Sequence, residues 1–88
     1  MATPENQPAN DWLRQKQKGE TMLTATNKAL RKVGHLLSRE EFKEIEKLTG
    51  DVAVALEKES LNELIAAISA LDEGTIHLAD LLIYSHFS

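Results

Sequence analysis

The side chains best suited to acid–base or metal chemistry in this 88-residue chain are its three histidines. Only His77 has carboxylates at helical reach, with Glu73 about one turn before it and Asp80 about one turn after it. Metal sites in helical bundles are built from side chains that project inward from two or more helices. The spacing places both carboxylates on an outward face, so we expect a solvated surface and no metal site here.

Nucleophilic catalysis and nucleotide binding also lack their usual patterns. A catalytic serine needs a base and an orienting group, yet Ser38 and Ser60 stand where their hydroxyls cap helices. Phosphate-binding loops need clustered glycines, whereas the four glycines are widely separated. Asp72, on the flank of an apolar stripe, is expected to pair with a basic side chain, for example from the first helix. We expect no catalytic residue and no cofactor site, and therefore no enzyme activity.

Charge and hydropathy narrow the possible partners and locations. Residues 1–37 hold six basic and three acidic residues, whereas residues 38–88 hold four basic and eleven acidic, for a net charge of −4. An acidic majority repels phosphate backbones, so we expect no nucleic-acid partner. With no long apolar run and no signal-peptide pattern, we expect no membrane partner and a cytoplasmic location. The absence of cysteine excludes disulfides and thiolate chemistry.

Two helix-start signals divide the chain. Ser38 and Ser60 are each followed three residues later by a glutamate, the pattern of a capping box that satisfies two backbone N–H groups. Residues 1–10, with two prolines among polar residues, are expected to be a disordered lead or an added, non-native extension. Residues 11–88 are then a single all-α domain, an antiparallel three-helix bundle with a protruding long first helix. The helices are expected at about residues 11–34, 39–58 and 61–85.

Apolar residues at steps of three and four predict the inward face of each helix. In the first two helices these are Met22, Leu23, Thr26, Ala29, Leu30, Val33, Phe42, Ile45, Leu48, Thr49, Val52 and Leu56. In the third they are Leu61, Leu64, Ile65, Ile68, Leu71, Thr75, Leu78, Ala79 and Leu82. Gly34 is expected to end the first helix in the left-handed conformation, Gly50 to face outward, and Gly74 to be exposed and tolerated. Residues 15–20 have no apolar stripe, so the front of the first helix should project past the bundle.

The C-terminal stretch is apolar nearly all round, more than one antiparallel core can bury. Broad apolar surfaces usually mark an interface, so we expect a homodimer or another partner at this end. A frayed terminal turn without a partner is the alternative. The residues predicted for self-association are Leu78, Leu81, Leu82, Ile83, Tyr84 and Phe87.

From residue 19 to about residue 82, the order of these signals resembles the C-terminal helical lid of DnaK-type chaperones, the seventy-kilodalton heat-shock family. The matching residues at the first helix and turn are Gly19-Glu20, Leu23, Thr26, Lys28, Leu30, Gly34 and Leu37-Ser38. The match continues through Ile45-Glu46, Ala55-Leu56, Lys58-Glu59-Ser60, Leu64, Ile68, Leu71 and Leu78. Features similar to HscA, the branch serving iron–sulfur cluster assembly, are Gln15-Lys16, Leu36-Leu37-Ser38 and the run from Asp72 through Thr75 to Leu78-Ala79.

The resemblance implies one part of a larger chaperone. Family members carry an ATPase domain and a β-sandwich that grips extended apolar peptide, and the lid closes over the sandwich and slows peptide release. ATP would then be bound by the parent protein, and the partners of this part would be the β-sandwich and an unfolded or client protein. Residues 81–84 are more apolar here than in HscA-like chains. The alternative is a stand-alone helical adaptor that binds a partner helix through its apolar C-terminal face.

Overall fold

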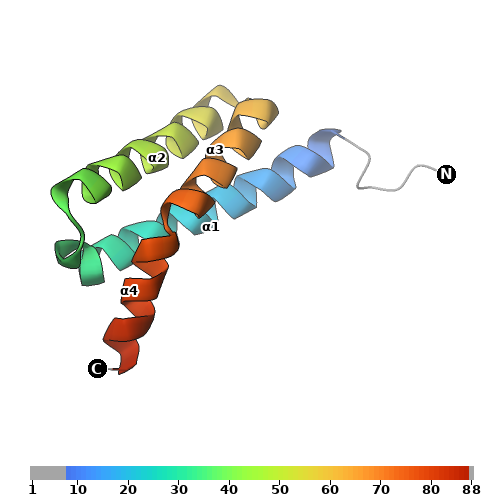
Figure 1. Ribbon diagram of the computed structural model, residues 1–88. Helices are drawn as coiled ribbons and strands as arrows, with labels where there is room; N and C mark the ends of the chain where they lie inside the picture. The colour runs from blue at the N-terminus through green and yellow to red at the C-terminus, as the bar shows by residue number, and fades with distance from the viewer. Residues whose placement is uncertain (1–7, 88) are drawn as a thin grey trace.

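The computed structural model describes the backbone of residues 8–87 and the side chains of residues 11–86. Within this part the chain is all-α and has no strand, which confirms the predicted helical bundle (Figure 1). Its elements are α1 (Pro8–Val33), the 3₁₀ helix η2 (Gly34–Leu36), α2 (Arg39–Lys58), α3 (Leu61–Gly74) and α4 (Ile76–Phe87).

The long helix α1, with 26 residues, is the element on which the others are assembled. Helices α2 and α3 form an antiparallel pair that lies across α1, and α4 turns away from that pair and packs against α1 (Figure 1). Helix α1 begins at Pro8, three residues before the predicted start, because proline is well suited to a first helical position. Residues 8–10 therefore belong to the helix, and the rest of the predicted lead lies outside the described residues.

Both serine caps form, and they set the starts of α2 and α3. The Ser38 hydroxyl accepts from the Glu41 N–H at 3.1 Å, and the Glu41 carboxylate accepts from the Ser38 N–H at 3.3 Å. The Ser60 hydroxyl accepts from the Glu63 N–H at 3.4 Å. At Ser60 the structure thus has a cap, without the reciprocal bond of the full box.

The predicted single helix over residues 61–85 is wrong, because it breaks at Thr75. The Thr75 hydroxyl donates to the carbonyl of Leu71 at 2.8 Å, and the backbone of Thr75, with φ −108° and ψ 11°, leaves the helical conformation. Such side-chain bonds to the preceding turn compete with regular helix geometry. Gly74, just before the break, lies so close to α2 that a Cβ there would meet the side chain of Leu48. Gly74 is thus a point of close helix contact within the chain.

Gly34 does not end α1 in the left-handed conformation, since no described glycine has a positive φ. It is buried, and a Cβ there would lie 2.8 Å from Cε2 of the Phe42 ring, so the ring occupies the space that a side chain would need. The left-handed residue is instead Glu59, with φ 54° and ψ 37°, which ends α2 and directs the chain into α3. Gly50 faces solvent, as predicted, and a Cβ there would meet no other side chain or element within 4 Å.

The core has two parts. The α2–α3 cluster is formed by Leu48, Val52, Ala55, Leu64, Ile68 and Leu71. The α1–α4 cluster is formed by Ala29, Val33, Ile45 and Leu78, with Leu81 and Leu82 packed against it. The predicted inward stripes are confirmed except at Ile65, which is 45% exposed, and at Ala79, which is also exposed.

The front half of α1 reaches the α2–α3 cluster although it lacks an apolar stripe. Gly19 is buried, and a Cβ there would lie 3.3 Å from Cδ1 of Leu64 and 3.4 Å from Cγ1 of Val52. Trp12, partly buried, also packs against this cluster, while the start of α1 extends past the α2–α3 pair in Figure 1. A backbone contact at a glycine therefore replaces the missing stripe.

Candidate functional site

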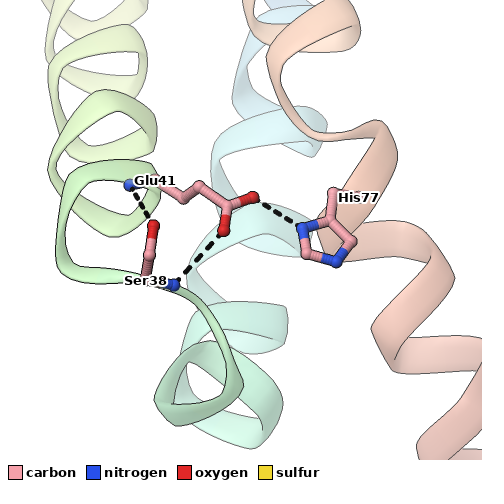
Figure 2. A network of polar contacts seen from close by, with 3 residues as sticks. All are labelled: Ser38, Glu41 and His77. Carbon is pink, nitrogen blue, oxygen red and sulfur yellow. Dashed lines mark hydrogen bonds and ion pairs between the residues drawn. The ribbon is translucent and has the colours of Figure 1, made fainter.

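The clearest polar contact between distant parts of the chain joins His77 to Glu41. His77 Nδ1 lies 2.6 Å from Glu41 Oε2, across 36 residues of sequence. His77 belongs to the first turn of α4 and Glu41 to the first turn of α2, so this contact ties the starts of two helices together (Figure 2). Both side chains are about half exposed, at 54% and 43%.

The capping box positions the Glu41 carboxylate. One oxygen accepts from the Ser38 N–H and the other faces the His77 ring, so a single side chain closes the N-terminus of α2 and contacts α4 (Figure 2). The hydrogen bond from His77, followed by that from the Ser38 backbone, lowers the pKa of Glu41 below its ordinary value near 4.5. The carboxylate is also at the positive end of the α2 dipole, which favours its charged form.

Ser38, Glu41 and His77 are not hydrogen-bonded in the order of a catalytic triad, in which the histidine lies between the serine and the acid. The Ser38 hydroxyl accepts from the Glu41 N–H, and His77 meets the glutamate and not the hydroxyl. A nucleophilic serine must pass its proton to the histidine, which this arrangement does not allow. The network is best described as a structural clamp between α2 and α4.

Sequence reasoning selected His77 but missed its partner. It considered only the carboxylates along the same helix, Glu73 and Asp80, both of which are exposed. The observed partner lies on α2, because His77 follows the break at Thr75 and its Nδ1 lies 2.6 Å from Glu41 Oε2. Two sequence features could have indicated this contact. One is the capping-box glutamate, Glu41, and the other is a histidine, His77, that closely follows the Gly74-Thr75 pair.

The predicted self-association residues do not share one surface. Leu78 is 2% exposed and belongs to the α1–α4 cluster, so its assignment to an exposed interface is wrong. Leu81 and Leu82 are half-buried against the same cluster. Ile83 and Tyr84 are 56% and 77% exposed, and the side chain of Phe87 lies outside the described residues. The reason is that α4 packs on α1 with one face and leaves the opposite face to solvent.

We define the α4 outer face as the exposed side of this helix, formed by Ile76, Asp80, Ile83 and Tyr84. Positions i, i+4, i+7 and i+8 lie on one side of a helix, so these residues form a continuous strip. Ile76 is 63% exposed and was not singled out from the sequence. The break at Thr75 explains why, since the isoleucine that follows it starts a new helix.

A groove between α1 and α4 is the second surface feature at this end of the molecule. It has a volume of about 1070 Å³ and combines apolar with basic side chains. Its lining residues are Ala25, Lys28, Ala29, Arg31, Lys32, Leu82, Ile83, Ser85 and His86. We call it the α1–α4 groove.

The polar side chains of the described residues form no metal site, because no group of three or more His, Asp or Glu residues among them is placed to hold a metal ion. The Asp72 carboxylate is exposed and forms no ion pair with a described residue, so its predicted pairing with a basic side chain is wrong; it lies on the solvent side of α3. None of the helices at residues 8–87 has the length and apolar character needed to cross a bilayer.

Comparison with models of protein families, with curated proteins and with solved structures finds no match to this chain.

Proposed function

We propose that this chain is the helical lid subdomain of a DnaK-type chaperone, possessing no catalytic activity of its own and helping to retain bound unfolded peptide or client protein. In this role it works through contacts with other protein surfaces. ATP would be bound elsewhere in the parent protein, and the adjoining partner would be a β-sandwich that holds the peptide.

The observation that carries the proposal is that the residues bearing the resemblance are those that shape the bundle. Gly19 lets α1 approach α2 and α3, and Gly34 makes room for the Phe42 ring. Ser38 and Ser60 cap α2 and α3. A chance likeness of apolar spacing would not be expected to coincide with close-contact glycines and caps as well.

The surface that a lid would present to the β-sandwich is the front of α1. Leu13 is a large apolar side chain there, 54% exposed although Trp12 beside it packs on the α2–α3 cluster. Three basic residues at positions 14, 16 and 18 follow on the same stretch and are exposed as well. An exposed apolar side chain beside charged residues is a common composition for a protein contact.

The test measures peptide release from a DnaK-type β-sandwich domain that lacks its own lid. A fluorescent apolar peptide is bound to that domain, and its dissociation rate is followed with and without the full 88-residue chain. We expect slower release with the chain, and loss of the effect in Leu13→Lys. Val54→Lys, at a side chain 47% exposed on α2, is the matched control. An unchanged dissociation rate at a saturating concentration of the chain would overturn the proposal. Saturable heat when the chain is titrated with ATP in a calorimeter would overturn it as well.

The adaptor alternative is favoured by a different observation, the α4 outer face. Ile76, Ile83 and Tyr84 are among the most exposed large apolar side chains in the described structure. A partner helix would cover them, and Tyr84→Lys would then abolish capture of that partner while leaving peptide release from the β-sandwich unaffected. The two variants, Leu13→Lys and Tyr84→Lys, therefore distinguish the two functions.

A further inference from the structure

The α1–α4 groove carries a cluster of positive charge in a chain that is acidic overall. Lys28, Arg31 and Lys32 line it from α1, and no Asp or Glu among the described residues lines it. All three are exposed, and none forms an ion pair with a described residue. The apolar part of the lining, which includes Ala25 and Leu82, lies beside them. The groove therefore suits an apolar surface flanked by carboxylates.

Helix stability alone does not explain this charge. Arg31 and Lys32 lie in the last turn of α1, where cations favourably meet the negative end of the helix dipole. Lys28 lies a turn earlier, where that effect has largely faded. The dipole also does not account for the apolar lining between these residues and α4.

The α4 outer face has the complementary composition. It presents Ile76, Ile83 and Tyr84 with Asp80 among them, and Asp80 is exposed and forms no ion pair with a described residue. Residues 59–88 contain five Asp/Glu and no Lys or Arg. Every Lys and Arg of the chain therefore lies before the acidic C-terminal helices, and the two surfaces match in both polarity and charge.

The same chain cannot satisfy this match by itself. The face of α4 that packs on α1 carries Leu78, Leu81 and Leu82, whereas Asp80 lies on the opposite side of the helix. Asp80 is thus turned away from the cations of its own α1. A second copy can bring its Asp80 to them, and two-fold symmetry would then form the same contact twice.

We propose that two copies of this chain associate through these surfaces, with the α4 outer face of each copy packed along the α1–α4 groove of the other. Ile83 borders both surfaces, which places it near the two-fold axis. Asp80 of each copy faces Lys28, Arg31 and Lys32 of the other. This association does not depend on the lid role, which uses the front of α1.

The test is a charge exchange followed by sedimentation over a concentration series, with circular dichroism melts to show that each variant is folded. Asp80→Lys and the double change Lys28→Glu/Lys32→Glu should each weaken the dimer, on the order of ten-fold in dissociation constant, because symmetry repeats each loss. A mixture of the two variants should form a heterodimer, since both of its contacts then pair opposite charges.

Matched controls place the same charge changes elsewhere on exposed positions. They are Glu57→Lys on α2 and Lys16→Glu/Lys18→Glu at the front of α1. These should leave the dissociation constant within about two-fold of the parent, because solvent screens distant charges. A parent chain that stays monomeric at the highest concentration would overturn the proposal. The proposal would also be overturned if the control variants weakened the dimer as much as the Asp80 and groove variants do. A mixture of the two charge variants that stays monomeric would overturn it equally.

Discussion

Replacing Gly34 with alanine should destabilise the bundle through one contact, the ring of Phe42. The backbone at Gly34 is not left-handed, so alanine can adopt it. A Cβ there would lie 2.8 Å from Cε2 and 3.3 Å from Cδ2 of the ring, whereas ordinary contact begins at 3.4 Å. The ring must therefore retreat by roughly 0.6 to 1.2 Å to reach normal carbon–carbon separations. Overpacking of this kind costs about 1 to 3 kcal/mol.

Urea and thermal denaturation followed by circular dichroism measure this cost. For a domain of this size, each kcal/mol lowers Tm by about 4 to 8 °C. Gly50→Ala is the matched control, because Gly50 lies in the middle of α2 and the alanine Cβ would meet no other side chain or element within 4 Å. That change should stabilise the fold by about 1 kcal/mol, since alanine is the better helix former. The same substitution is thus expected to have opposite signs at two positions.

A double-mutant cycle identifies the contact responsible. Phe42→Leu shortens the side chain that opposes Gly34, so adding Gly34→Ala to it should cost less than about 0.5 kcal/mol. The coupling free energy between the two changes should then be about 1 kcal/mol or more. If the two costs simply add, the ring is not the obstacle, and a backbone requirement for glycine at this position would explain the loss instead.

Three further changes test the core, the clamp and the two faces of α4. Leu64→Ala, at a fully buried side chain, should cost about 2 to 5 kcal/mol in urea melts, whereas Ile65→Ala, at a side chain 45% exposed, should change stability by less than about 1 kcal/mol. Because the pKa of Glu41 is lowered in the fold, this carboxylate stabilises the fold above its ordinary pKa near 4.5, and the stabilisation is lost as the pH falls through the folded pKa. The Glu41→Gln variant should therefore lose less stability than the parent between about pH 6 and about pH 3.5. Equal losses in the two proteins would contradict this. Leu81→Lys, half-buried in the α1–α4 cluster, should lower Tm clearly, while Tyr84→Lys should leave the Tm of the monomer nearly unchanged at dilute concentration.

The starts of helices α2 and α3 could be predicted from the sequence because serine caps act locally. The Ser38 hydroxyl and the Glu41 N–H are three residues apart, so their bond needs no knowledge of the rest of the fold. Inward stripes are equally local, and Val52 and Ile68 lie in the core as their spacing predicts. At Ile65 the same reasoning was wrong, because spacing fixes the direction of a side chain but not how far the neighbouring helices reach around it.

The roles of the glycines could not be predicted, because they depend on side chains that are distant in sequence. Gly19 meets Leu64, and Gly34 meets Phe42, and in each case the partner is known only after the helices are packed. A glycine after a helix is usually a left-handed cap, which is why Gly34 was assigned that role. The actual left-handed residue, Glu59, has no sequence signal of its own.

The break at Thr75 was invisible to periodicity for a specific reason. Leu71 and Leu78 are seven residues apart, and both are buried, so the apolar stripe continues through the break as it would in an unbroken helix. Only the direction of the chain changes, and direction is not encoded in the spacing of one stripe. That change of direction brings His77 to Glu41, lays α4 along the end of α1, and thereby forms the α1–α4 groove beside the cations of α1. The same turn leaves the opposite side of α4 uncovered, so the clamp, the groove and the exposed apolar strip all follow from one threonine hydroxyl and the glycine before it.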